Sequence, residues 1–353
     1  MKHFTILFLL FISITAPAQE KAKNIILFIG DGMGTAHVYG AMVANKTTLN
    51  IEKFKFSGFS KTYSGSDLIT DSGAGGTAIA CGKKTYNGAI GVDMDTQNLK
   101  SILKIAKEQG KSVGIVSSCA FTHATPASFV ANNASRKNDE AIALDFLKSD
   151  IDVVIAGGSD YLINRNDHLN LSDSLVKRGY GWYVSFEDCM KSDSRKIYCL
   201  SYTKHPPAIP QRGDYLENAT AKAIEILSAN PNGFFLMVEG SQIDWASHAK
   251  DGKKAIEEVI DLDHAVGKAM TFCEKEPSTL IILTADHETG GMTLVGGNRS
   301  AGTVKTKFTT NGHSAVMVPV FASGPSADLF SGIYENTAIF TKMLEALGIS
   351  FDY

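Results

Sequence analysis

The stretch "KNIILFIGDGMG", Lys23 to Gly34, indicates the fold of this chain more clearly than any other segment. Its apolar residues Ile25 to Ile29 leave no polar face, which is typical of a strand buried on both sides of a parallel sheet. The apolar run stops near Asp31, which has glycine on either side, so the backbone there is able to approach a ligand closely. We therefore predict a buried strand with a carboxylate at its carboxyl end.

Three further segments share this design of an apolar run followed by acids, histidine or hydroxyl groups. They are "KSVGIVSSCAFTHATP" (residues 111–126), "GFFLMVEGSQIDWASH" (233–248) and "STLIILTADHETGG" (278–291), and "DVVIAGGSDYL" (152–162) is a fifth expected strand. Stretches with helical periodicity lie between them, such as "KKAIEEVIDLDHAVGKAMTF" (253–272). Strands that alternate with helices predict a doubly wound α/β fold, with a mostly parallel central sheet and helices on both faces.

The polar residues that follow these strands are expected to lie close together. In a parallel sheet the carboxyl ends of the strands meet at one edge, and ligands bind there. The residues concerned are Asp31, His123, Thr125, Glu239, Asp286 and His287. Solvated loops do not explain why four separate strands end in this way, so we predict one functional site at that edge.

The composition limits the classes of function. The chain has 353 residues, 44% of them hydrophobic, which is ample for a large core. No linker or repeat interrupts residues 19–353, so we expect one domain, with the polar and aromatic stretch 163–213 as a surface excursion. A formal net charge of −3 without a basic stripe argues against nucleic-acid binding.

The N-terminus has the pattern of a secretory signal. Lys2 precedes an apolar stretch from Phe4 to Ile14, and Ala16-Pro17-Ala18 is a small-x-small cleavage pattern. We expect residues 1–18 to be removed near Ala18 and the protein to be secreted or periplasmic; the alternative is an N-terminal hydrophobic strand. No other segment approaches the ~20 apolar residues of a membrane span.

The five cysteines are odd in number and form no CxxC pair, which argues against a zinc ribbon. Cys189 and Cys199 flank a polar loop across which a disulfide would reach in an oxidising compartment. Spacing alone does not decide that pairing.

Several acids and histidines have the character of metal ligands. Asp244 and His248 are four residues apart, so a helix places them on one face, where they are able to hold one zinc ion. His313 lies in a glycine-containing loop, where it is either a ligand or a histidine bound by backbone groups. Oxygen and nitrogen donors of this kind suit zinc together with magnesium.

Ser72, in "LITDSGAGGTAIACG" (Leu68 to Gly82), has two interpretations. It is either the cap of the helix that the small residues begin, or a nucleophile held at that helix start. The stretch is not a G-x-S-x-G elbow, because Thr70 and Ala74 occupy the glycine positions.

Six motifs together resemble the alkaline phosphatase family. They are "IILFIGDGMG", "TDSGAGGTA", "THATPASFVANNASR", "VEGSQIDWASH", "TADHETGG" and "NGHSA", and they occur in the family's order between about Asn24 and about Pro325. The resemblance implies an enzyme that hydrolyses phosphate monoesters to an alcohol and inorganic phosphate, through a phosphoserine intermediate and with two zinc ions and one magnesium ion.

The resemblance also implies a role for each matching residue. Ser72 is the implied nucleophile, Arg136 the phosphate clamp, and Asp71 and Trp245 their neighbours at the substrate mouth. The implied ligands are Asp244, His248 and His313 for a first zinc, Asp31, Asp286 and His287 for a second zinc, and Asp31, Thr125 and Glu239 for magnesium. His123 stands where members of the family vary, and its imidazole brings the magnesium site closer to the preferences of zinc.

Ordinary structural roles remain open for several of these residues. Arg136 is otherwise a surface ion-pair partner, Thr125 a turn former before Pro126, and Trp245 a core residue. The other histidines, His37, His168, His205 and His264, are interpreted as structural or surface residues.

The resemblance leaves the assembly and the exact reaction open. The stretch from Glu288 to His313 is brief, so the large crown-like insertion of some family members is expected to be reduced or absent, and both a homodimer and a monomer fit the chain. The alternative functions are a phosphodiesterase or sulfatase-like hydrolase of the same superfamily, and a periplasmic phosphate- or zinc-binding protein without turnover.

Overall fold

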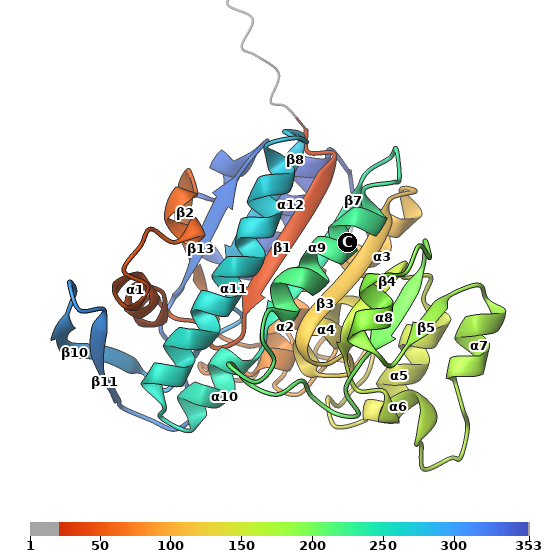
Figure 1. Ribbon diagram of the computed structural model, residues 1–353, viewed down its shortest axis with the longest axis horizontal. Coiled ribbons are helices and arrows are strands. Elements are labelled where there is room, and N and C mark those ends of the chain that lie inside the picture. Colours follow the sequence, from red (N-terminus) through yellow and green to blue (C-terminus); the bar gives the residue numbers. More distant parts are fainter. Residues whose placement is uncertain (1–20, 352–353) are drawn as a thin grey trace, which may run out of the picture.

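A ten-stranded sheet forms the centre of the molecule (Figure 1). The computed structural model describes residues 21–351, so the expected signal segment lies outside the described residues. In sheet order the strands are β14 (Gly332–Glu335), β2 (Phe56–Lys61), β13 (Val318–Ser323), β8 (Thr279–Thr284), β1 (Asn24–Gly30), β7 (Phe234–Gly240), β3 (Ser112–Ala120), β4 (Val153–Gly157), β6 (Ile197–Leu200) and β5 (Gly181–Tyr183). β13 runs antiparallel to both neighbours, and the other neighbouring pairs are parallel. The predicted mostly parallel sheet is confirmed.

Helices cover both faces of the sheet because strands such as β1 are apolar on both sides. Ile25, Leu27 and Ile29 of β1 belong to one core layer, and Ile26 and Phe28 belong to the other. The first layer includes α2 (Ser72–Cys81), α3 (Ile102–Glu108), α4 (Ala124–Val130), α5 (Asp139–Lys148) and α12 (Thr337–Leu347). The second includes α1 (Thr35–Ala44), α9 (Tyr215–Leu227) and α11 (Gly252–Cys273), and Figure 1 shows α9 and α11 in front of the sheet. The predicted doubly wound fold is therefore confirmed.

The stretch 163–213 corrects one expectation, since it is not only a surface excursion. It contains α7 (Ser172–Lys177) and α8 (Phe186–Met190), and it follows α6 (Asp160–Ile163). It also supplies β5 and β6, which extend the sheet beyond β4, and β6 is fully buried. The apolar run of β6 is only four residues long and has polar flanks, so local periodicity does not reveal it. It becomes a strand because it pairs with β4.

The disulfide considered for Cys189 and Cys199 does not form in the structure. Cys189 lies in α8, Cys199 lies in β6, and both are buried free thiols. None of the helices in residues 21–351 is long and apolar enough to cross a membrane.

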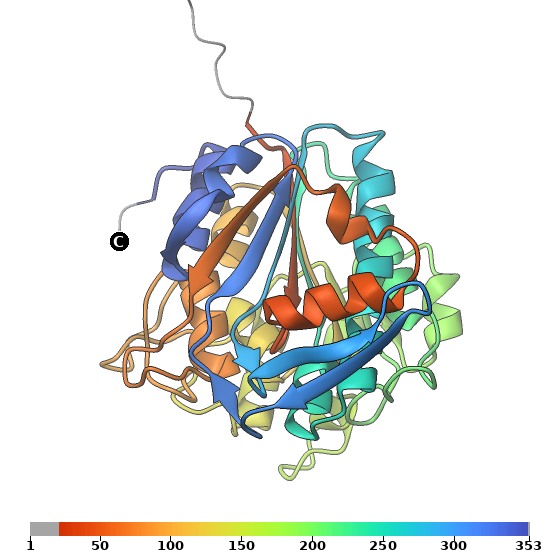
Figure 2. The same ribbon diagram turned by 90° about the vertical axis from the view of Figure 1, so that its left-hand side faces the viewer.

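Short elements between β8 and β13 connect the sheet to the functional edge. The hairpin of β10 (Met292–Asn298) and β11 (Thr303–Phe308) lies beside α1 (Figure 2). β9 (Glu288–Thr289) pairs with β12 (His313–Ser314), and this pairing brings His313 back to the residues that follow β8. The remaining elements are α10 (Gln242–His248) and the 3₁₀ helices η1 (Asn50–Lys53) and η2 (Ala327–Phe330).

Candidate active site

Four adjacent strands deliver the predicted site residues to one edge of the sheet. β8, β1, β7 and β3 are neighbours in that order, and Glu239 of β7 pairs in register with Ile29 of β1. Asp31 follows β1 directly, and Asp286 and His287 follow β8 after a gap of one residue, Ala285. His123 caps α4 beyond β3, and Thr125 is in its first turn. The structure thus brings together the residues that the four strand ends predicted.

Ser72 is the first residue of α2, and Asp71 is the helix cap. The Asp71 carboxylate accepts a hydrogen bond from the Ala74 N–H at 3.0 Å, so the interpretation of Ser72 as the cap is wrong. The Ser72 hydroxyl is left to face His287, with 3.2 Å between Oγ and Nε2. A Cβ on Gly75 would lie 2.8 Å from the Asp286 carbonyl oxygen, so glycine at that position lets α2 lie against the end of β8.

Asp244, His248 and His313 form the first group of converging donor atoms. Both histidines place Nδ1 on a backbone carbonyl, His248 on Asn311 at 2.6 Å and His313 on Thr70 at 2.8 Å. Their Nε2 atoms are 3.3 Å apart, and each lies within 3.5 Å of Asp244 Oδ1. The backbone carbonyl of Thr70 therefore accounts for only one ring nitrogen of His313. The other nitrogen, Nε2, faces His248 and Asp244.

The two histidines of this first group have opposite pKa shifts. The hydrogen bond to Asp244 raises the pKa of His248 to about 9, whereas burial, and then the neighbouring His287, lowers the pKa of His313 to about 4. The contact with Asp244 thus favours the protonated form of His248, whereas burial favours the neutral form of His313.

Asp31, Asp286 and His287 form the second group, and all three are fully buried. His287 Nε2 lies 3.4 Å from Asp31 Oδ1 and 3.5 Å from Asp286 Oδ2. Both oxygens of Asp31 lack a hydrogen-bond partner. Burial, and then the carboxylates of Asp286, Asp244 and Glu239, raise the pKa of Asp31 well above its ordinary value.

Glu239 and Thr125 lie beside the second group. Burial is the largest of the causes that raise the pKa of Glu239 to about 7, and its Oε1 has no hydrogen-bond partner. The Thr125 hydroxyl is 3.5 Å from Asp286 Oδ2. Thr125 is buried in the site, so its role is more than shaping the turn before Pro126.

These donor groups fit divalent cations. Acids and imidazoles from distant segments converge within 4.8 Å, and several buried acceptor atoms have no donor. An isolated buried charge is costly, so a cluster of carboxylates needs a positive partner. Histidine ligands commonly donate their second ring N–H to a backbone carbonyl, as His248 and His313 are placed to do.

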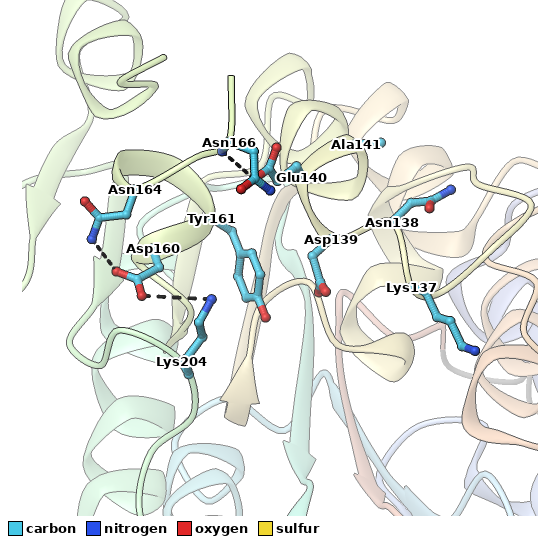
Figure 3. Close-up of a pocket in the computed structure, with 10 residues that line it drawn as sticks. All are labelled: Lys137, Asn138, Asp139, Glu140, Ala141, Asp160, Tyr161, Asn164, Asn166 and Lys204. Atoms are coloured by element: carbon cyan, nitrogen blue, oxygen red, sulfur yellow. Dashed lines mark hydrogen bonds and ion pairs between the residues drawn. The ribbon is translucent and has the colours of Figure 1, made fainter. Parts of the chain in front are cut away.

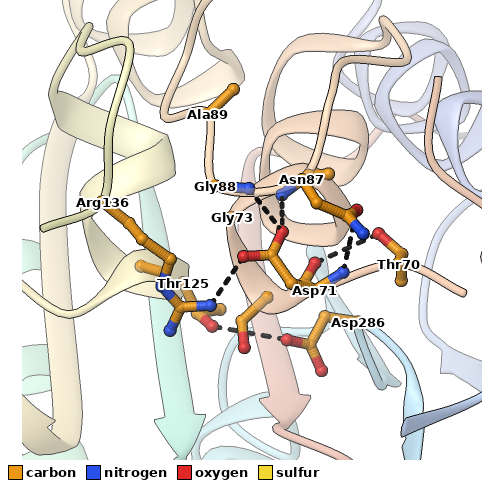
Figure 4. A network of polar contacts seen from close by, with 12 residues as sticks. Thr70, Asp71, Gly73, Asn87, Gly88, Ala89, Thr125, Arg136 and Asp286 are labelled. Atoms are coloured by element: carbon orange, nitrogen blue, oxygen red, sulfur yellow. Dashed lines mark hydrogen bonds and ion pairs between the residues drawn. The ribbon is translucent and has the colours of Figure 1, made fainter. Parts of the chain in front are cut away.

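Arg136 reaches into the site (Figure 4). Its Nη1 donates to Asp71 Oδ2 at 2.8 Å, and its Nη2 lies 3.4 Å from His123 Nε2. The Arg136 side chain is only 26% exposed, which separates it from an ordinary surface ion pair. Burial raises the pKa of Asp71, but Arg136 and the N–H groups of Ala74 and Gly88 more than offset this and hold it below its ordinary value.

Three rings form a wall beside Arg136. Trp245 packs edge-on against His123 at 5.9 Å between centroids and against His205 at 4.8 Å. His205 accepts a hydrogen bond from the Ala120 N–H at 3.0 Å, which anchors the wall to β3. From the sequence, His205 was expected to be a structural or surface residue, because nothing in "SYTKHPPAIP" signals its contact with a strand far away in sequence.

A polar cavity of about 460 Å³ is lined by residues adjacent in sequence to Arg136 and His205 and by none of the metal-donor residues (Figure 3). Lys137 and Lys204 line it, and they are the neighbours of Arg136 and His205. Its acids are Asp139, Glu140 and Asp160, so the cavity carries both signs of charge.

Thr289 is a functional position that the sequence did not reveal, whereas His37 has the structural role expected of it. The Thr289 hydroxyl donates to Asp244 Oδ1 and lies 3.2 Å from His287 Nδ1, so one side chain orients a ligand of each group. His37 is buried between the Gly34 N–H and the Ser247 hydroxyl, and it ties the loop after β1 to α10. The contacts of Thr289 with Asp244 and of His37 with Ser247 span 45 and 210 residues, so they have no local signal.

We expect Thr289→Val to weaken the binding of a divalent cation, with zinc as the probe, about 10- to 100-fold, the usual effect of losing a residue that orients a metal ligand. Valine keeps the volume but cannot hydrogen-bond Asp244 or His287. Competition with a chromogenic zinc chelator measures this affinity. Thr289→Ser should bind zinc as the parent chain does, and equal affinity in the valine variant would contradict the orienting role.

Comparisons with known proteins agree with this site. The family model described as alkaline phosphatase matches residues 22–307. Alkaline phosphatase 4 of Bacillus subtilis is 40% identical over 302 residues, which cover 79% of this chain and 65% of that protein, just under two thirds of its length. The alkaline phosphatase of Escherichia coli is 30% identical, over 94% of this chain and 87% of that protein.

A solved structure extends the agreement to three dimensions. The alkaline phosphatase from the Antarctic bacterium TAB5 matches with a TM-score of 0.89 and 38% identity, over 95% of this chain and 100% of that chain. The predicted resemblance is confirmed, and the chain belongs to the alkaline phosphatase family, whose members are metal-dependent hydrolases that act on phosphate monoesters.

Proposed function

We propose that this chain hydrolyses phosphate monoesters through a phosphoserine formed on Ser72. The observation that carries the proposal is the position of the Ser72 hydroxyl. It stands at the N-terminus of α2, 3.2 Å from His287 Nε2, where two donor groups and Arg136 meet. A protein that only binds phosphate or zinc does not need a hydroxyl at this point.

The residues present fit three cations. Asp244, His248 and His313 would hold one zinc, and Asp31, Asp286 and His287 would hold a second. Asp31, Thr125 and Glu239 would hold magnesium, which prefers oxygen ligands. When bound, these ions lower the pKa of a coordinated hydroxyl and stabilise negative charge that develops on the phosphate and the leaving oxygen.

A solved relative supports the third site. A variant of the TAB5 enzyme in which a histidine is replaced by aspartate has magnesium bound in its M3 site. We propose that His123 lies at the corresponding third site of this chain. Its imidazole would let that site take either magnesium or zinc.

Ser72 performs the covalent step. Its Oγ forms a bond to phosphorus while it gives up its proton, the bond from phosphorus to the alcohol oxygen breaks, and the alcohol takes up a proton. Water then attacks phosphorus, the bond to Oγ breaks, and Ser72 regains its proton as inorganic phosphate leaves. The first backbone N–H groups of α2 would be available to a phosphate on Ser72, and the helix dipole favours its negative charge.

Arg136 orients the phosphate. The guanidinium presents a planar fork that matches two nonbridging phosphate oxygens. Its ion pair with Asp71, which itself caps α2, fixes the fork relative to Ser72. Asp71 is therefore a positioning residue that links the nucleophile to the clamp.

The test is a comparison of kcat/KM for a phenyl phosphate monoester, its diester and the corresponding sulfate, with zinc and magnesium supplied. We expect the monoester to be preferred, because its dianion matches the cationic site. Arg136→Ala should lower monoester kcat/KM on the order of 10²-fold, as for loss of one charge-stabilising donor. Arg299→Ala, which removes an exposed arginine, is the matched control. A preference for the diester or sulfate would support the alternative hydrolases, and no turnover would support a binding protein.

We also propose that the mature chain is exported and forms one catalytic domain. The signal pattern of residues 1–18 supports export, and the single central sheet supports one domain. The brief stretch between Glu288 and His313, which contains a hairpin and short β pairing, favours a compact enzyme without a large crown, as a monomer or a homodimer.

A further inference from the structure

A thiol lies among the oxygen and nitrogen donors of the site. Cys119 of β3 is fully buried, and its Sγ is 3.2 Å from Glu239 Oε2. One donor atom each from Cys119, His123 and Glu239 lies within 4.8 Å of the others. Within residues 21–351, this is the candidate metal group that contains a cysteine.

Two polar side-chain atoms of this group have no hydrogen-bond partner. They are Glu239 Oε1 and His123 Nδ1, and both are buried. Leaving a buried polar atom unpaired destabilises the fold, so two such atoms beside one thiol indicate a site for a ligand. Arg136 does not meet this need, because its nearest contact in the group is with His123 Nε2.

The donor chemistry of the group differs from that of a magnesium site. Magnesium takes oxygen ligands and gains nothing from a thiol. A sulfur, an imidazole nitrogen and a carboxylate oxygen together are a zinc donor set, with a fourth position left for water. His123 is only partly buried, whereas Cys119 and Glu239 are fully buried.

We propose that Cys119, His123 and Glu239 form a thiolate-containing zinc site, which shares Glu239 with the magnesium site and competes with it. On binding, the S–H bond of Cys119 breaks, a metal–sulfur bond forms, and the proton passes to solvent. The proposal rests on Glu239 being a metal ligand in the proposed function, and Cys119 is its new element. Excess zinc should displace magnesium through Cys119.

Cobalt(II) reports directly on the thiolate. The metal-free protein is titrated with Co²⁺, and the near-ultraviolet absorption that thiolate-to-cobalt charge transfer produces is recorded together with cobalt content. We expect the band to appear with the third equivalent bound. It should disappear in Cys119→Ser, whose hydroxyl preserves a contact to Glu239, and persist in Cys81→Ser, a buried thiol outside every candidate metal group. Cys119→Ala is a second variant if the serine variant does not fold.

The outcomes separate this site from the proposed function. Absence of the band in the parent chain, or its persistence in Cys119→Ser, would overturn the thiolate site. Monoester turnover with zinc and magnesium is measured on the same samples, and it should be retained in Cys119→Ser with about tenfold weaker inhibition by excess zinc, the loss expected for one ligand. Equal inhibition of the two proteins would also count against the proposal.

Discussion

Ser72→Ala is expected to lower kcat for a phosphate monoester on the order of 10⁴- to 10⁶-fold, the range for a hydrolase that loses its nucleophile. The Ser72 Oγ stands 3.2 Å from His287 Nε2, at the start of a helix whose cap is a different residue, Asp71. Removing the hydroxyl therefore removes the covalent step and leaves the helix capped. Zinc content and the midpoint of thermal unfolding should stay close to those of the parent chain.

The matched control is Ser172→Ala, which also removes a buried hydroxyl but in α7, outside the site. A second measurement traps the intermediate: acid quenching during turnover of a labelled monoester should leave label on the parent chain and none on Ser72→Ala. An alanine variant that kept activity within tenfold of the parent, or that still acquired label, would refute covalent catalysis at Ser72.

Asp31→Asn is expected to lower kcat/KM about 10³-fold, because a bound metal contributes several kcal/mol of charge stabilisation. Asp31 is the carboxylate that the second zinc group and the magnesium group would share, and neither of its oxygens has a hydrogen-bond partner. The measurements are kcat/KM and bound metal. Asp263→Asn, at a buried aspartate that holds η1 to α11, should leave metal content unchanged. Full metal content in Asp31→Asn would contradict a ligand role.

The same substitution should have the opposite effect on the stability of the metal-free protein. Burial and neighbouring carboxylates raise the pKa of Asp31 in the folded state. Its contribution to stability is therefore fully present below the unfolded pKa of about 3.9 and is lost as pH rises through the folded pKa. Without metal, Asp31→Asn should unfold at a higher temperature than the parent, by a margin that grows from pH 4 to pH 8.

With zinc and magnesium bound, the order should reverse, because ligand binding stabilises the folded state by mass action and the variant has lost a ligand. Calorimetry with and without chelator measures both margins. A metal-free Asp31→Asn that is less stable than the parent at pH 8 would show that Asp31 has a positive partner within the protein.

Part of this molecule was predictable because its signals are local. The apolar runs of β1, β3, β4, β7 and β8 reveal strands buried on both faces, and helical periodicity reveals the layers that cover them. The position of Asp31 directly after β1 then follows from the pattern of parallel sheets. Motif order alone indicated the family, which the comparisons confirm.

Other features depend on residues that meet only after folding. The strand β6 is visible only against the edge of β4, and the contact of His205 with the Ala120 N–H joins segments 85 residues apart. Asp71 was expected beside Ser72, but its hydrogen bonds to Ala74 and Gly88 were needed to show that it caps α2.

The sequence by itself determined the strands β1, β3, β4, β7 and β8, their two apolar faces and the edge at which acids and histidines gather. The tertiary structure alone decided which atoms meet there: that Thr289 joins Asp244 to His287, and that Cys119 faces Glu239. The physical reason is that the local periodicity of apolar residues indicates which faces of a strand or helix are buried. The convergence of donor atoms within a few ångströms depends instead on register between strands and on loops that return from far away in sequence.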